Sequence, residues 1–274
     1  MAKKFLSDRI IKLAKIKRRK IGISILWTDR VILDSLKKSK RIAEVIIYGK
    51  KLSGFKNVPG KDLSVGVQMI RDFKAGKIDQ LVRGQVDDLS MVEEAKKLYD
   101  INPKLRRIDI GLVQTSLGQE FFMTGASNPD LQTLKEKIYF SAEAAKWIKN
   151  VFKVAPKIAV MATCRPGSVG RDPVMTKTYE EAEATVKHLK SLGYYAENVN
   201  IEIERAVKFA NLVIPARGTI GNQIFRAIAY LSHGKILACP TYFPGKLIYE
   251  DDSRNEKDWY PHILFAAALA NMKK

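Results

Sequence analysis

The chain has 274 residues, of which 46% are apolar and 28% charged, a composition typical of a folded protein rather than a disordered one. This length is enough for one large or two ordinary domains with a hydrophobic core. No apolar run approaches the roughly 18 to 20 residues of a membrane-spanning helix. The basic N-terminal stretch interleaves apolar residues with cations, unlike a signal peptide, so we expect a cytoplasmic protein with no membrane partner.

Short apolar runs of strand type alternate with amphipathic stretches of helical period along the chain. The expected strands cover residues 21–26, 45–48, 80–82, 108–113, 157–161, 212–214 and 236–238. The expected helices cover residues 29–38, 65–73, 90–99, 131–152, 179–192, 201–210, 220–233 and 257–271. This order predicts an α/β fold with mostly parallel sheets covered by helices on both faces. Ligands of such sheets usually lie beyond the carboxyl ends of the strands.

The expected helix at 131–152 is longer than one layer over a sheet requires, and a turn signal at residues 127–130 precedes it. We therefore expect it to connect two domains, with a boundary near residue 145.

The net charge of +19 arises because 48 Lys and Arg residues face 29 Asp and Glu residues. Three explanations fit: a bound nucleic acid, an anionic substrate such as a phosphate, acyl phosphate or coenzyme A, and the lysine-rich surface of a hyperthermophile protein. The excess is strongest at residues 12–20 and 37–41, where no aromatic residues are interleaved to stack on bases. We therefore favour the anionic substrate and the charged surface over nucleic acid.

The cysteines and histidines give no sign of a metal site. Cys164 and Cys239 are far apart and form no CxxC motif, so neither a disulfide framework nor a zinc site is expected. His188, His233 and His262 are isolated from one another, and we expect each to be a surface or helix-end residue.

The most informative segment spans residues 211–226 (NLVIPARGTIGNQIFR), where a buried strand leads through a glycine-bearing loop into a helix. Glycines let several backbone N–H groups point at one spot, which suits an anion. The alternative is that the glycines only permit the turn. The candidate anion-binding residues are Gly218, Gly221, Asn222 and Arg226.

Two more loops at expected strand ends have a similar character. The loop after residues 157–161 carries two glycines, a serine and two arginines, and the loop after residues 80–82 begins with an arginine and a glycine. Backbone N–H groups and arginines in such loops can bind phosphate, although a flexible surface turn is the alternative. The candidates are Arg83, Gly84, Arg165, Gly167 and Ser168.

A hydroxyl, a guanidinium and a carboxylate lie close together near the start of the last expected helix, at Ser253, Arg254 and Asp258. Such a trio can deprotonate a nucleophile and balance developing negative charge. A solvated helix cap is the alternative.

Five short motifs in order resemble those of the phosphate acetyltransferase and butyryltransferase family. They are KIDQLVRG at residues 77–84, NP at 128–129 with PKIA at 156–159, GS at 167–168, the segment 210–226, and DSR at 252–254. The chain is more similar still to a small archaeal branch labelled methanogenesis marker protein 4, or putative methyltransferase subunit X of methanogens.

The resemblance implies two three-layer α/β/α domains of the isocitrate and isopropylmalate dehydrogenase kind, with a cleft between them. It also implies that a second crossing near residues 244–245 returns the last helix to the first domain. The expected domains are therefore residues 1–145 with 247–274, and residues 146–246. The second domain is implied to form a homodimer.

In the acyltransferases of this family, a coenzyme A thiol attacks an acyl phosphate. The resemblance implies that Asp258 is the base, that Ser253 holds the nucleophile and that Arg254 stabilises the transition state. Coenzyme A or another phosphate-bearing carrier would be the cofactor. The anion site would be lined by Gly167, Ser168, Gly221, Asn222 and Arg226.

The chain also departs from the family pattern. The segment 124–128 lacks the usual aspartate, Asp87 and Asp88 replace hydroxyl residues, and Asp258 lies two positions closer to Ser253 than its family counterpart. Two functions therefore remain open. One is a transferase of methanogen metabolism that moves a methyl or acyl group, and the other is a non-catalytic binding or assembly protein with the same fold.

Overall fold

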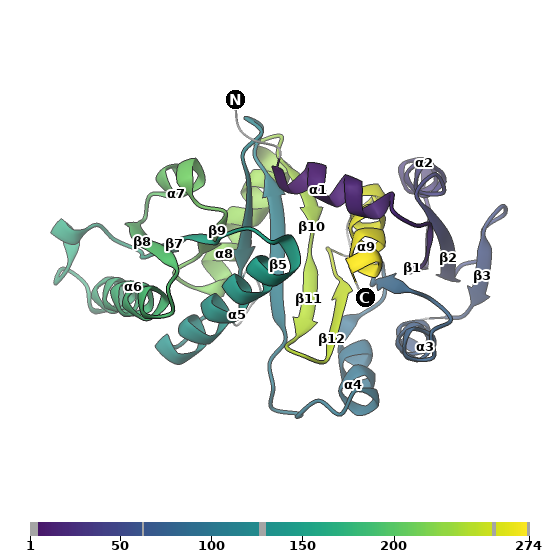
Figure 1. The fold of residues 1–274 in the computed structure, drawn as a ribbon, viewed down its shortest axis with the longest axis horizontal. Helices are drawn as coiled ribbons and strands as arrows, with labels where there is room; N and C mark the ends of the chain where they lie inside the picture. The colour runs from purple at the N-terminus through teal and green to yellow at the C-terminus, as the bar shows by residue number, and fades with distance from the viewer. Residues whose placement is uncertain (1–4, 62, 126–129, 254–255, 273–274) are drawn as a thin grey trace. The chain divides into compact units, whose positions relative to one another are not determined.

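The computed structural model describes residues 5–61, 63–125, 130–253 and 256–272. They form strands and helices in alternation, mostly with parallel pairing, which confirms the predicted α/β fold (Figure 1). The chain divides into two compact units. We call Ile108–Ile236, with the residues up to Leu6, the central unit, and Ser7–Arg107, with the residues from Leu237 onward, the terminal unit. None of the described helices is both long and apolar enough to cross a membrane.

The sheet of the terminal unit has the strand order β3-β2-β1-β4-β12-β11, and all neighbours are parallel except β11 and β12. Its strands are β1 (Arg19–Ile25), β2 (Ala43–Gly49), β3 (Lys56–Pro59), β4 (Gln80–Val82), β11 (Pro240–Phe243) and β12 (Leu247–Glu250). Its helices are most of α1 (Phe5–Ala14), then α2 (Arg30–Ser39), α3 (Leu63–Lys74), α4 (Asp88–Leu98) and α9 (Tyr260–Met272). Helices α2 and α9 pack together over β1 and β2, and α3 packs with α4 (Figure 1).

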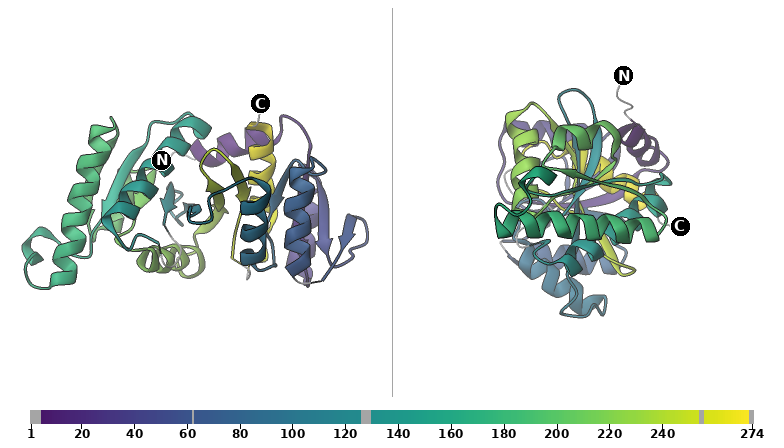
Figure 2. Two further views of the ribbon diagram at one scale, coloured as in Figure 1. Left: turned by 90° about the horizontal axis from the view of Figure 1, so that it is seen from below. Right: turned by 90° about the vertical axis from the view of Figure 1, so that its left-hand side faces the viewer.

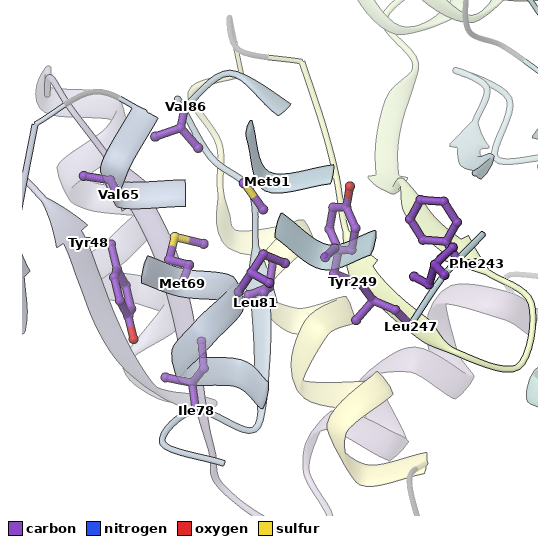
Figure 3. Close-up of a cluster of buried hydrophobic side chains, with 13 residues drawn as sticks. Tyr48, Val65, Met69, Ile78, Leu81, Val86, Met91, Phe243, Leu247 and Tyr249 are labelled. Atoms are coloured by element: carbon purple, nitrogen blue, oxygen red, sulfur yellow. The ribbon is translucent and has the colours of Figure 1, made fainter. Parts of the chain in front are cut away.

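A buried apolar cluster joins the sheet of the terminal unit to α3 and α4 (Figure 3). Leu81 and Tyr249 contribute from the strands, and Met69 and Met91 from the helices; all four are fully buried. Burying each such side chain contributes roughly 1.5 to 3 kcal/mol of hydrophobic free energy. This cluster fixes β4 and β12 beside each other, and the loops that follow these two strands carry predicted site residues.

The sheet of the central unit has the order β5-β6-β9-β7-β8, with antiparallel pairing only between β5 and β6. Its strands are β5 (Ile108–Gln114), β6 (Glu120–Thr124), β7 (Lys157–Met161), β8 (Tyr195–Asn200) and β9 (Leu212–Ile214). Its helices are α5 (Leu134–Phe152), α6 (Pro173–Ser191), α7 (Ile203–Phe209) and α8 (Gly218–Arg226), with short helical turns η1 (Pro166–Ser168) and η2 (Ala227–Leu231). The long helices α5 and α6 lie side by side (Figure 1 and Figure 2). Strand β10 (Lys235–Ala238) contains the point where the chain passes back to the terminal unit.

Side-chain alternation along β6 explains why helices cover both faces of this sheet. Phe121 packs into an apolar cluster with Val213 and residues of α7 and α8. The next residue, Phe122, points to the other face and contacts Trp147 and Phe152 of α5, at ring-centroid distances of 5.7 and 5.0 Å. Because neighbouring residues of a strand point to opposite faces, one strand supplies two separate core layers.

The compact units divide the sequence at 6/7, 107/108 and 236/237, which differs from the predicted boundaries at 145/146 and 246/247. The reason is long-range pairing: β6 pairs in parallel with β9, and α5 packs against β9. Residues 108–145 therefore associate with strands that come much later in the chain. The predicted homodimer through the second domain stays a prediction.

Helix α5 begins at a side-chain cap that can be tested directly. Thr133 is exposed, and its hydroxyl accepts a hydrogen bond from the Glu136 N–H at 3.2 Å. Thr133→Ala is expected to lower the free energy of unfolding by about 1 kcal/mol, because that N–H loses its protein partner. Thr133→Ser keeps the cap and should stay close to wild type. Urea denaturation of both variants checks this, and equal stabilities would contradict the capping role.

Candidate functional site

Strands β1, β4 and β12 are parallel neighbours, so their carboxyl ends lie at the same edge of the terminal unit's sheet. Three segments leave this edge: the end of β1 leads into residues 26–29, β4 into residues 83–87 and β12 into residues 251–253. We call the polar residues gathered there the strand-end cluster. They are Ser24, Arg83, Gly84, Gln85, Asp251 and Asp252.

Arg83 is the centre of the strand-end cluster, and only 7% of its side chain is exposed. Its Nε donates to the Asp251 carboxylate, its Nη2 to the Asp252 carbonyl oxygen, and its Nη1 to the Val86 carbonyl oxygen at 2.8 Å. Burial alone would lower the pKa of Arg83, but Asp251 and Asp252 raise it above its usual value. The guanidinium therefore stays charged and fastens the segment after β12 to the end of β4.

Gly84 lets the backbone of β4 turn against the end of β1. Its φ is +71°, and a Cβ at this position would lie 2.1 Å from the Ser24 carbonyl oxygen. The Ser24 hydroxyl donates to the Arg83 carbonyl oxygen and accepts from the N–H groups of Gln85 and Val86, at 2.9 and 3.2 Å. Contact of Arg83 and Gly84 with an anion remains a prediction, and it would require some of these internal bonds to open.

The predicted catalytic trio begins next to a buried carboxyl group. The Asp252 side chain is 1% exposed, and burial raises its pKa well above the usual value although Arg83 opposes this. Ser253 follows and is half-buried. Arg254 lies outside the described residues. Asp258 is exposed, and its Oδ1 accepts the Tyr260 N–H at 3.2 Å, so this carboxylate contacts the first residue of α9.

A second buried polar pair consists of Glu250, the last residue of β12, and His262 in α9. Glu250 Oε1 accepts the Cys239 N–H at 2.7 Å and lies 2.7 Å from His262 Nδ1. Burial raises the pKa of Glu250 well above its usual value and lowers that of His262 to about 4. Sequence reasoning missed this pair and expected His262 at the surface or at a helix end. His262 does lie at a helix end, as the third residue of α9, but it is not at the surface, because α9 is buried on nearly all sides and takes this side chain into the core.

The buried position of His262 predicts its titration. Its pKa in the folded protein lies below the ordinary 6.5, so the unfolded chain takes up the proton first as pH falls. The stability that His262 contributes is therefore present above pH 6.5 and lost between pH 6.5 and about 4. We expect the imidazole resonances of His262 in NMR spectra to keep the neutral form from pH 8 to about 5. Protonation near pH 6.5 would contradict this burial.

In the central unit, the predicted strand–loop–helix at residues 211–226 is confirmed as β9 followed by α8. Gly218 and Gly221 are buried at the start of the helix, and a Cβ on Gly221 would lie 2.6 Å from Pro215 Cγ. Close packing of the helix on its own loop therefore explains this glycine. Asn222 and Arg226 are exposed, and the Arg226 guanidinium lies over the Tyr230 ring, 5.2 Å from its centroid.

The loop after β7 is open to solvent. Gly167 and Ser168 form the short turn η1, and a Cβ on Gly167 would meet nothing within 4 Å. Arg165 is exposed and pairs with Glu202 at 3.0 Å. Because β7 and β9 are parallel neighbours, this loop and the start of α8 leave the same edge of the central sheet. The candidates thus form two sets, one at the strand ends of each unit.

None of the described residues forms a group of three or more His, Cys, Asp or Glu that could hold a metal ion.

No family model matches the chain. The curated "Putative methyltransferase mtx subunit X" of Methanosarcina mazei is 26% identical over 267 residues, covering 95% of this chain and 94% of the relative. A phosphotransacetylase from Streptococcus pyogenes matches the fold with a TM-score of 0.69 and 15% identity, covering 98% of this chain and 99% of the other. A branched-chain phosphotransacylase from Enterococcus faecalis matches the fold with a TM-score of 0.66 and 15% identity, covering 92% of this chain and 99% of the other.

These similarities confirm the resemblance predicted from the sequence. The curated relatives include proteins of methanogens named "Putative methyltransferase mtx subunit X", and the solved neighbours include phosphotransacylases. At 15% identity the solved structures show a shared fold and nothing further.

Proposed function

We propose that this chain, which is similar to the methanogen subunit X proteins along most of its length and has the phosphotransacylase fold, acts in group transfer. The transferred group would be methyl or acyl, and the ligand a phosphate-bearing carrier such as coenzyme A. Ser253, Arg254 and Asp258 would serve the reaction, and the loops after β7 and β9 would bind the anionic part of the carrier. The protein would act in the cytoplasm of a methanogen, as a homodimer.

The observation that carries the proposal is the position of Ser253. It lies three residues after the end of β12, whose carboxyl end lies beside that of β4, and α/β sheets usually bind their ligands at this edge. The preceding residues, Asp251 and Asp252, are held by Arg83. A hydroxyl in a fixed segment at this edge is suited to orient a nucleophile.

A second candidate is a subunit that binds the carrier without catalysing the transfer. Two observations favour it. The Asp258 carboxylate accepts a hydrogen bond from the first turn of α9, and the Arg83 guanidinium donates to Asp251 and to backbone carbonyl oxygens. Both groups therefore bind other parts of the protein itself. In this case the fold would present the carrier to another protein, in keeping with the word "subunit" in the relatives' name.

Ligand binding tests the proposal first. Coenzyme A, acetyl phosphate, coenzyme M and a pterin are screened by thermal shift, because a ligand specific for the folded state raises the melting temperature; at 100 times Kd the stabilisation is about 2.7 kcal/mol. We expect a shift with at least one phosphate-bearing carrier. No binding of any phosphate-bearing compound would refute the proposal.

Variants then separate the two candidates. Ser253→Ala and Asp258→Ala should bind the carrier as wild type does. If the protein is a transferase, Ser253→Ala should lower turnover by two to four orders of magnitude, as losses of general acid–base or electrostatic catalysis do. Full biological activity of both variants would favour the non-catalytic subunit. Retention on a polyanion column that falls steeply with salt would instead support nucleic-acid binding.

A further inference from the structure

The central unit contains a buried charged network that the proposed catalytic residues do not include. It consists of Lys137 on α5, Glu181 on α6 and Arg217 in the segment between β9 and α8. Their side chains are 0%, 6% and 16% exposed. Three elements that are far apart in the sequence therefore meet at one carboxylate.

A single oxygen of Glu181 binds both cations. Its Oε2 lies 3.3 Å from Lys137 Nζ and 2.5 Å from Arg217 Nη1. The same Nη1 also donates to the Ala216 carbonyl oxygen at 2.8 Å, which fixes the guanidinium against its own backbone. Within the described residues, Arg217 makes its hydrogen bonds through Nη1 and none through Nε or Nη2, and 16% of its side chain is exposed.

The network carries an excess of positive charge, because two cations share one carboxylate. Burial lowers the pKa of Lys137 to about 8, Glu181 opposes this shift, and Arg217 adds to it. Among the described residues, Glu181 from α6 and Arg217 from the segment after β9 are the charged groups that act on the pKa of Lys137. Asp130, whose carbonyl oxygen accepts the Gly218 N–H, is a further buried acidic residue beside the Arg217 segment. A buried cation without full compensation is costly, and an anionic ligand would relieve that cost.

Arg217 is also part of the predicted anion-binding loop. It is the residue immediately before α8, whose first residues are the predicted Gly218 and Gly221. The N–H of Gly218 donates to the Asp130 carbonyl oxygen at 2.9 Å, so the backbone of this loop is held in place as well.

We infer that Lys137 and Glu181 are positioning residues, which hold the Arg217 guanidinium so that its remaining N–H groups meet a phosphate group of the carrier. This inference rests on the proposed function and names Arg217, which is not among the anion-binding residues predicted from the sequence. Glu181 sets the orientation of the guanidinium. Lys137 adds positive charge and keeps the carboxylate from neutralising Arg217 completely.

The role of Lys137 gives anion binding a defined pH dependence. Below pH 8 the network carries one net positive charge, and above pH 8 Lys137 loses its proton and the network becomes neutral. The affinity for a phosphate group should therefore fall as pH rises through about 8. Lys137→Met removes the buried cation and leaves Glu181 paired with Arg217, so this variant should fold.

The experiment is isothermal titration of coenzyme A, with inorganic phosphate as a second probe, at pH values from 6.5 to 9.5. Wild type is compared with Lys137→Met and with the matched control Lys146→Met, an exposed lysine on the same helix. At pH 7 we expect Lys137→Met to bind about tenfold more weakly, a loss in keeping with removal of one nearby charge. It should also lose the pH dependence near 8, whereas Lys146→Met keeps the wild-type profile.

Wild-type affinity and pH profile in Lys137→Met would overturn the inference. If no probe binds wild type at any pH, the proposed function fails, and hydrogen exchange then decides on the positioning role. Glu181→Gln and the charge-conserving Arg217→Lys should both speed amide exchange at residues 217–221 relative to Lys146→Met. Unchanged exchange in Arg217→Lys, which keeps the charge and should fold, would show that the network does not hold this segment.

Discussion

Replacing Gly84 by alanine is expected to lower the free energy of unfolding by about 4 kcal/mol or more, a loss found when a substitution forces both backbone strain and a steric clash. The new Cβ would lie 2.1 Å from the Ser24 carbonyl oxygen and 2.7 Å from its hydroxyl oxygen. Neither β1 nor β4 can move away to relieve this clash, because both strands are buried in the middle of the terminal unit's sheet. The change would also displace the segment that holds Arg83.

Gly76→Ala is the matched control for this prediction. Gly76 has the same φ of +71°, but a Cβ there would meet nothing within 4 Å. Gly76→Ala should lower the free energy of unfolding by only about 1 kcal/mol, because the substitution adds backbone strain without a clash. Urea denaturation of both variants gives the difference. Similar losses at the two positions would mean that the contact with Ser24 does not limit the residue at 84.

Arg83→Met is expected to destabilise the protein by about 3 to 5 kcal/mol, because removing one partner of a buried ion pair leaves the other partner uncompensated. The affected carboxyl groups are those of Asp251 and Asp252, whose side chains are 14% and 1% exposed. The segment that carries Ser253 would lose its attachments to β4. Turnover that depends on Ser253 should therefore fall together with stability.

The pH dependence and a surface control make this second prediction specific. Without Arg83, which holds the pKa of Asp252 down, the folded-state pKa of this buried carboxyl group rises further, so it binds more protons in the folded protein than in the unfolded chain, and stability is lost as pH rises. The difference in free energy of unfolding between Arg83→Met and wild type should thus become smaller as pH falls toward 4. Arg205→Met breaks an exposed pair with Glu197 and should cost about 0 to 1 kcal/mol. If the difference in free energy of unfolding between Arg83→Met and wild type stays constant from pH 7 to 4, an uncompensated buried charge is not the cause of the destabilisation.

Several strands were missed in the sequence, and for β8 the reason is that it lacks an apolar run. Strand β8 reads YAENVN, with only Ala196 and Val199 fully buried, since it lies at the edge of the central sheet. An edge strand needs fewer buried residues than a central parallel strand, so its local pattern is weak. Strands β6 and β12 are short, with five and four residues, and were missed although most of their residues are apolar and buried.

In the candidate site too, features set by the local sequence were predicted and features set by distant residues were not. The glycine-bearing turn after β9 follows from local backbone requirements, and the sequence predicted it correctly. The role of Arg83 could not be predicted, because its partner Asp251 lies 168 positions away in the chain. The pair of Glu250 and His262 was missed for another reason: a lone histidine in an apolar helix does not indicate which buried carboxyl group it will meet.

The sequence alone determined the alternation of strands and helices, the parallel α/β class and the strand–loop–helix at residues 211–226, since each depends on spacing between near neighbours. Only the tertiary structure decided which segments share a unit, that Arg83 binds carboxylates of its own protein, and that Lys137, Glu181 and Arg217 meet. These features depend on strand order and on contacts between distant residues. Local periodicity carries no information about either.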